Sequence, residues 1–133
     1  MIRDKKIGKK RILVIEDEMD ICKIIAFRLK SAGYQVTVAN DGETGLKKAK
    51  RNVPDLIILD LMLPGIPGEM VCKSLREDDR VDLQQIPIIM LTAKSGDVDR
   101  LIGKVIGANV YLTKPFDADS LIGEVSRALE ICC

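Results

Sequence analysis

Histidine and tryptophan are absent from this 133-residue chain, and aromatic side chains make up only 3% of it. Without histidine, no catalytic scheme can use a histidine base, which excludes the Ser-His-Asp and Cys-His arrangements. A zinc site is not expected either, because none of the four cysteines stands in a CxxC spacing. The sequence therefore directs attention away from nucleophilic triads and zinc chemistry.

Long hydrophobic runs are also missing. No stretch approaches the roughly 18 uninterrupted apolar residues of a membrane helix, and the basic N-terminus lacks the apolar segment of a secretory signal. We therefore expect a cytoplasmic protein without a membrane partner. The length suits one domain, and the 47% hydrophobic and 31% charged composition is typical of a globular one.

Charge is unevenly distributed along the chain. The formal net charge is +1, but residues 1–11 contain six Lys or Arg residues and one Asp. Residues 1–10 are interpreted as a basic tail preceding a single domain at 11–133. Such a tail could contact nucleic acid or another acidic surface, but it is more often merely solvated. We expect no direct nucleic-acid binding by this domain.

Strand-like and helix-like segments alternate through the rest of the chain. A polar connection is expected at Asp78–Gln85. The predicted strands are Ile12–Ile15, Gln35–Ala39, Leu56–Leu59, Ile86–Leu91 and Asn109–Leu112. The predicted helices run from about Asp20 to Ala32, Glu43 to Arg51, Glu69 to Glu77 and Asp97 to Ile106, and a last helix is capped by Asp117.

Strict alternation of strands and helices predicts an α/β fold with an open parallel sheet and helices on both faces. Right-handed crossovers then require a doubly wound topology. For five strands, the flavodoxin-like order 2-1-3-4-5 is the natural choice.

Chemically useful side chains follow four of the five predicted strands. Glu16 and Asp17 follow the first strand, Asp60 the third, Thr92 the fourth and Lys114 the fifth. The carboxyl ends of parallel strands share one edge of the sheet, where ligand sites form at the topological switch point. The sequence thus predicts that three carboxylates, a hydroxyl and an ammonium converge.

Three carboxylates in one cleft repel each other unless a cation lies between them. A hard cation with oxygen ligands fits best, which indicates Mg²⁺. Asp60 is the candidate nucleophile, because carboxylates can form aspartyl-phosphate intermediates. Thr92 can donate its hydroxyl and Lys114 can supply a positive charge to a phosphoryl group. Singly, each residue also has an ordinary explanation, such as a solvated acid, a helix cap or a turn.

Four motifs carry a resemblance to a known family: Leu13-Val14-Ile15-Glu16-Asp17-Glu18, Asp60-Leu61-Met62-Leu63-Pro64-Gly65, Leu91-Thr92-Ala93 and Tyr111-Leu112-Thr113-Lys114-Pro115-Phe116. Together they resemble the receiver domain of bacterial two-component response regulators. The resemblance covers nearly everything from Arg11 to about Ile131.

The resemblance implies that Asp60 accepts a phosphoryl group from a partner histidine kinase or phosphotransfer protein. It also implies that Asp17 and Asp60 bind Mg²⁺ directly, together with the backbone carbonyl of Met62. Glu16 would act on the metal largely through water. In the family pattern, Thr92 and Lys114 would hold the phosphoryl oxygens.

Tyr111 resembles the family's switch aromatic, which turns inward when the threonine, here Thr92, moves toward the phosphoryl group. A buried structural tyrosine is the plainer explanation of the same residue. The resemblance further implies a phosphoacceptor switch rather than a turnover enzyme. Its downstream partner would be an effector protein or an output domain, and the sequence does not identify it.

Two features depart from the pattern of winged-helix regulators in this family. Asn109-Val110 stands where two acids are usual, and Glu124 where an arginine is usual. These positions form inter-subunit salt bridges in the family's common activated dimer, so that dimer is not expected here.

Two alternative functions are weaker. A flavin-binding electron carrier would need a Ser/Thr-rich phosphate loop after the first strand and aromatic rings over the flavin. A phosphohydrolase working through an aspartyl phosphate would need a second acid two residues after the nucleophile, where Met62 stands.

Overall fold

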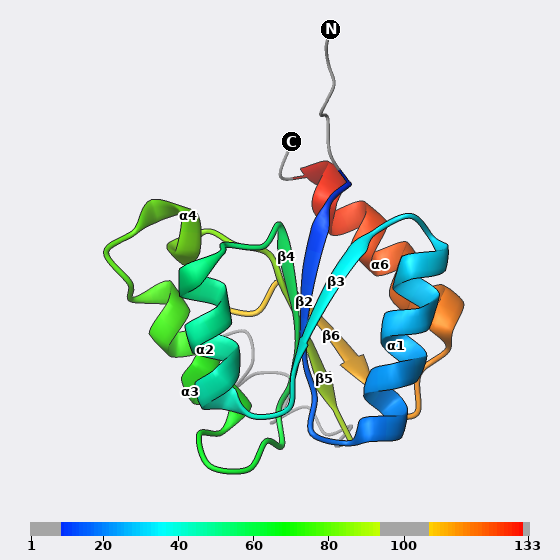
Figure 1. The fold of residues 1–133 in the computed structure, drawn as a ribbon, viewed down its shortest axis with the longest axis horizontal. Helices are drawn as coiled ribbons and strands as arrows, with labels where there is room; N and C mark the ends of the chain where they lie inside the picture. The colour runs from blue at the N-terminus through cyan, green and yellow to red at the C-terminus, as the bar shows by residue number, and fades with distance from the viewer. Residues whose placement is uncertain (1–8, 94–106, 132–133) are drawn as a thin grey trace, which may run out of the picture.

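The computed structural model describes residues 9–93 and 107–131. These residues form a five-stranded parallel sheet between two layers of helices (Figure 1). The fourth predicted helix, near Asp97–Ile106, lies outside the described residues, and so does most of the basic tail.

The strands confirm the predicted fold class. They pair in the order β3-β2-β4-β5-β6, which is 2-1-3-4-5 in chain order, and every pair is parallel. Their bounds are β2 (Arg11–Ile15), β3 (Gln35–Ala39), β4 (Leu56–Asp60), β5 (Ile88–Thr92) and β6 (Val110–Thr113).

Helices cover both faces of the sheet. In Figure 1, α1 and α6 lie on one side of the strands, and α2, α3 and α4 lie on the other. Their bounds are α1 (Met19–Ser31), α2 (Gly42–Arg51), α3 (Gly68–Arg76), α4 (Val81–Gln84) and α6 (Ala118–Ile131).

The central strand β4 is buried along its whole length because both faces are covered. Leu56 and Ile58 pack with side chains of α1 and α6, while Ile57 and Leu59 pack in the cluster that contains side chains of α2 and α3. The alternation follows from the period of two along a strand. Its consequence is that Asp60, the last residue of β4, is held on rigid backbone between two packed cores.

Two predictions for the segment between α3 and β5 are wrong. Asp78–Gln85 is not only a polar connection, because Val81–Gln84 forms the short helix α4, anchored by fully buried Leu83. The fourth strand begins at Ile88 rather than Ile86. Pro87 explains the later start, since it has no N–H to donate to the ladder, although its carbonyl accepts a hydrogen bond from Ile57.

Three helix ends carry turn or cap residues, and the predicted cap of the last helix by Asp117 is confirmed. Gly33 follows α1 with φ of 99°, the left-handed conformation that favours glycine. Asp41 caps α2 by accepting a 2.7 Å hydrogen bond from the Thr44 N–H, and this bond lowers the pKa of the Asp41 carboxyl. Asp117 accepts from the Asp119 N–H at the start of α6.

Asn109, one of the departures from the family pattern, is engaged within its own chain. Its Oδ1 accepts hydrogen bonds from the Ile88 N–H at 2.8 Å and from the Arg76 guanidinium at 3.0 Å. Arg76 also donates to the Gly107 carbonyl. These bonds tie α3 and the start of β5 to the segment that leads into β6.

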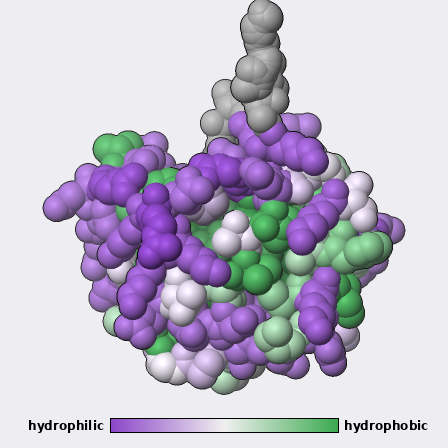
Figure 2. Space-filling model, viewed as in Figure 1, coloured by the Kyte–Doolittle hydropathy of each residue, from purple (hydrophilic) through white to green (hydrophobic). Residues whose placement is uncertain are grey.

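The surface in Figure 2 is mostly hydrophilic, with hydrophobic side chains gathered near the middle of the view, over the edge strand β3. Elsewhere, α1 exposes Ile24 and Phe27, with 58% and 69% of their surface accessible. Within residues 9–93 and 107–131, no helix combines the length and apolar character that crossing a membrane requires.

Candidate functional site

The polar residues predicted at strand ends do meet at one edge of the sheet. Glu16 directly follows β2, Asp60 and Thr92 end β4 and β5, and Lys114 directly follows β6. Glu16, Asp60 and Thr92 are no more than 2% exposed, although their neighbours along the strands are apolar. Buried polar groups at the end of a packed sheet are costly unless they are paired, so they indicate a site.

Three carboxylates form the centre of this site. One oxygen each from Glu16, Asp17 and Asp60 lies within 4.8 Å of the other two. The main chain of Glu16 is fixed on both sides: its N–H donates to Ala39 O at 3.0 Å, and its carbonyl accepts from Asn40 Nδ2 at 2.9 Å. The cluster is therefore built on the β2–β3 edge as well as on β4.

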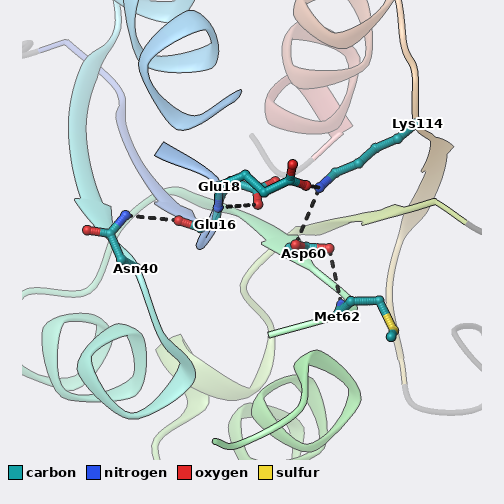
Figure 3. Close-up of polar contacts among 6 residues, drawn as sticks. All are labelled: Glu16, Glu18, Asn40, Asp60, Met62 and Lys114. Carbon is teal, nitrogen blue, oxygen red and sulfur yellow. Dashed lines mark hydrogen bonds and ion pairs between the residues drawn. The ribbon is translucent and has the colours of Figure 1, made fainter. Parts of the chain in front are cut away.

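Lys114 inserts its ammonium among the acids (Figure 3). Its Nζ lies 2.8 Å from Glu16 Oε1, 3.2 Å from Glu18 Oε1 and 3.4 Å from Asp60 Oδ2. Its backbone N–H donates to Thr92 O, which fixes the residue against the end of β5. The Lys114-Pro115 peptide bond is cis.

The electrostatics of the cluster reflect its burial. Burial raises the pKa of Asp60 to about 7, assisted by the nearby Glu16 charge and opposed by the Met62 N–H and the Lys114 ammonium. Burial alone would lower the pKa of Lys114, but the Glu16 and Asp60 carboxylates raise it to about 12. Lys114 is thus protonated at neutral pH, whereas at Asp60 burial and the Glu16 charge together outweigh the effect of the ammonium.

The residues fit a hard divalent cation. Carboxylate oxygens are the ligands that Mg²⁺ prefers, and Glu16 Oε1 is buried without a hydrogen bond of good geometry despite its ion pair with Lys114. A cation placed among Glu16, Asp17 and Asp60 would supply the missing positive charge. Asp17 is the most exposed of the three, so the cluster opens to solvent on its side.

The remaining predicted site residues lie close by. The Met62 N–H donates to Asp60 Oδ1 at 3.1 Å, and the Met62 side chain is 56% exposed. Thr92 pairs with Thr113 in the β5–β6 ladder, and Thr113 directly precedes Lys114. Tyr111 is half-buried and packs against the core cluster on the α2–α3 side. Tyr111 lies within β6, where it pairs with Met90, and not at the strand end.

Sequence reasoning included Glu18 in the first motif but missed it as a site residue. Glu18 does occupy the N-cap position of α1, but its side chain makes no capping hydrogen bond there. Its carboxylate instead contacts Lys114. Its position beside Asp17 at a strand end was the available signal. The hydrogen bond from Asn40 to the Glu16 carbonyl was also missed.

Gly68, the first residue of α3, packs directly on the end of β4. A Cβ atom there would lie 2.2 Å from Asp60 O and 2.8 Å from Leu61 Cα, and both of these are backbone atoms. We therefore expect Gly68→Ala to lower the free energy of unfolding by about 1–3 kcal/mol or more, because the backbone must move to relieve the overlap. Urea unfolding of the metal-free protein measures this change.

Gly123→Ala is the matched control, because Gly123 is an exposed position of α6 and a Cβ there meets nothing within 4 Å. This change should raise stability by about 0.5–1 kcal/mol through helix propensity alone. Equal effects of the two substitutions would contradict the close packing of α3 on Asp60.

Comparison with known proteins identifies relatives that match most of this chain. Residues 12–126 match the family model described as the response regulator receiver domain. The chain is 43% identical, over 120 residues, to the alkaline phosphatase synthesis transcriptional regulatory protein PhoP of Bacillus subtilis, with 90% of this chain and 48% of PhoP covered. It is 39% identical to the sensory transduction protein RegX3 of Mycolicibacterium smegmatis, with 89% and 50% covered. The chain thus spans about half the length of these relatives.

Solved structures agree. The chemotaxis protein CheY4 of Vibrio cholerae superposes with a TM-score of 0.85 at 30% identity, covering 91% of this chain and 99% of CheY4. The receiver domain of the sensor histidine kinase PA1611 of Pseudomonas aeruginosa superposes with a TM-score of 0.84 at 32% identity, covering 92% and 99%. That crystal structure has a magnesium ion coordinated in the active-site cleft.

Proposed function

The chain belongs to the receiver domains of two-component response regulators, and from this premise we propose that Asp60 accepts a phosphoryl group in a Mg²⁺-dependent reaction. The donor is a histidine kinase or a phosphotransfer protein. The observation that carries the proposal is the placement of buried Asp60, at the end of the central strand, within 3.4 Å of the Lys114 ammonium and beside Glu16 and Asp17.

The proposed step forms one bond and breaks another. A carboxylate oxygen of Asp60 attacks phosphorus, an O–P bond forms, and the bond from phosphorus to the donor's imidazole nitrogen breaks with its electron pair left on nitrogen. Asp60 must be deprotonated to attack. Its pKa of about 7 leaves it partly protonated at neutral pH, and positive charge in the site lowers that pKa. The Lys114 ammonium already contributes to the value of about 7, so the additional positive charge would come from a bound cation.

Mg²⁺ would be held by Asp17, Asp60 and the backbone carbonyl of Met62, with Glu16 acting largely through water. When bound, the metal would offset the negative charge of the incoming phosphoryl group. Two observations support it: the three carboxylate oxygens within 4.8 Å of one another, and the magnesium ion in the related PA1611 receiver domain.

Thr92 and Lys114 would hold the phosphoryl oxygens, and Tyr111 would report the new state to a partner surface. This part of the proposal is supported by position: Thr92 is buried at the site, and half-buried Tyr111 lies on the neighbouring strand β6. Such an arrangement is a two-state switch biased by charge-assisted hydrogen bonds. The protein would act by docking to an effector protein or through an output domain, rather than by turning over a separate substrate.

Intact-protein mass spectrometry after incubation with acetyl phosphate and Mg²⁺ tests the proposal. Wild type should gain one phosphoryl group, while Asp60→Ala, or wild type with EDTA, should gain none. Asp55→Asn is the matched control, because Asp55 precedes the same strand at its opposite end and should leave the adduct unchanged. An adduct that survives in Asp60→Ala would contradict the assignment of the acceptor.

A further inference from the structure

Glu18 completes a ring of three carboxylates around the Lys114 ammonium. Its backbone N–H donates to Glu16 Oε2 at 3.0 Å, which fixes the start of α1 over the buried acid. Its own carboxylate lies 3.2 Å from Lys114 Nζ (Figure 3). The Glu18 side chain is 60% exposed, against 0% for Glu16 and 3% for Asp60. Glu18 therefore contacts the ammonium from its solvent side.

The three acids surround the ammonium: Lys114 donates hydrogen bonds to Glu18 and Asp60 and forms an ion pair with Glu16. A lysine has three N–H donors and no acceptor, and Glu16, Glu18 and Asp60 provide three oxygens within 3.4 Å of it. A phosphoryl oxygen that is to contact Lys114 has to compete with these carboxylates for the ammonium. Glu18 is the one nearest to solvent, and its negative charge faces an incoming anion.

We propose that Glu18 is a positioning residue that holds Lys114 in the resting state and competes with the phosphoryl group for its ammonium. This inference rests on the proposed phosphorylation of Asp60. Removing the Glu18 charge weakens the hold of residue 18 on the Lys114 ammonium and takes a negative charge from the site. The weaker contact with Lys114 and the loss of negative charge both favour reaction with an anionic phosphoryl donor. The loss of negative charge also weakens the binding of Mg²⁺.

Glu18→Gln should therefore change two quantities in opposite senses. At saturating Mg²⁺, phosphorylation by acetyl phosphate should become about two- to fivefold faster, the range expected for an exposed ion pair. The Mg²⁺ dissociation constant, measured by calorimetry on unphosphorylated protein, should rise by a similar factor. Both changes should shrink at high ionic strength, because exposed charges are screened by salt.

Asp20→Asn is the matched control. Asp20 is an exposed acid in the first turn of α1, two residues from Glu18, and within the described chain it makes no ion pair with Lys114. It removes the same charge without touching the ammonium. If Asp20→Asn matches Glu18→Gln in both quantities, general electrostatics explain the result and the proposal is overturned. It is equally overturned if Glu18→Gln slows phosphorylation or leaves it unchanged.

A measurement without metal or donor tests the contact itself. In ¹⁵N-lysine-labelled, metal-free protein, the Lys114 side-chain resonance, assigned with Lys114→Met, should shift in Glu18→Gln and stay in place in Asp20→Asn. An unchanged resonance would overturn the proposal. Failure of the proposed function is recognised separately, because wild type would then form no adduct at Asp60, whatever residue 18 is.

Discussion

Asp60→Asn is expected to make the metal-free protein more stable, by a few kcal/mol at about pH 8 and by progressively less toward about pH 4. The physical reason is the burial of a carboxylate that is 2% exposed, beside the fully buried Glu16. Asparagine keeps the shape of the side chain and its acceptor for the Met62 N–H, but it removes the charge. Lys114 retains Glu16 and Glu18 as partners in the variant.

The pH dependence follows from the direction of the shift. The pKa of Asp60 rises from its ordinary value near 3.8 to about 7 on folding. As the pH increases through this window, the unfolded chain releases its proton first, so the folded wild type loses stability relative to the unfolded state. Below the window both states are protonated and the penalty disappears. The asparagine variant lacks this slope.

Urea unfolding in EDTA at a series of pH values measures the effect. Asp55→Asn is the control: Asp55 precedes β4 at the other end and accepts a 2.7 Å hydrogen bond from the Arg11 N–H. This substitution should not stabilise the protein. If Asp60→Asn instead destabilised the metal-free protein at about pH 8, the Lys114 contact would outweigh burial and the charge balance described above would be wrong.

The fold could be predicted because its signals are local and repeated. Apolar runs such as Leu56–Leu59 mark strands buried on both faces, and Gly33 and Asp117 mark helix ends where the structure has them. The helix α4 could not be predicted in the same way. It has four residues, too few for a periodic pattern, and it forms because Leu83 is buried against the rest of the fold.

The site could be predicted as a set of strand ends, but its internal balance could not. Parallel strands bring Asp60 and Lys114 together although 54 residues separate them. The contact of Glu18 with Lys114 depends instead on where α1 begins and on how a long side chain turns. The raised pKa of Asp60 depends on burial that only the packed helices create.

Lys114→Met is expected to destabilise the metal-free protein strongly, on the order of 3 kcal/mol. Methionine keeps an unbranched, flexible side chain, shorter by its terminal atom, and removes the charge. The change leaves Glu16, which is completely buried, and Asp60, which is nearly so, without the ammonium that contacts both. Removing one partner of a buried ion pair leaves an uncompensated charge, and the free energy of unfolding falls accordingly.

The loss should be greater at about pH 8 than at about pH 5. The pKa of Lys114 is raised to about 12, so its stabilising contribution is fully present below its ordinary pKa and does not vary over this range. Asp60 does vary: without the ammonium its pKa moves further up, and at the lower pH it binds a proton that relieves the repulsion from Glu16. Lys47→Met is the control, because Lys47 and its partner Glu43 are both more than 70% exposed and 4.0 Å apart. It should change stability by no more than about 0.5 kcal/mol.

Mg²⁺ distinguishes a charge effect from a packing defect in Lys114→Met. A cation that binds only the folded state stabilises it by an amount that grows with the ratio of its concentration to its dissociation constant. The acids of the variant lack the ammonium that competes with the cation. Added Mg²⁺ should therefore raise the melting temperature of Lys114→Met by more than that of wild type, and Lys47→Met should respond as wild type does. A packing defect alone would leave the metal site intact, and the rise would then equal that of wild type. A smaller rise in Lys114→Met than in wild type would mean that Lys114 helps to build the metal site instead of substituting for the metal.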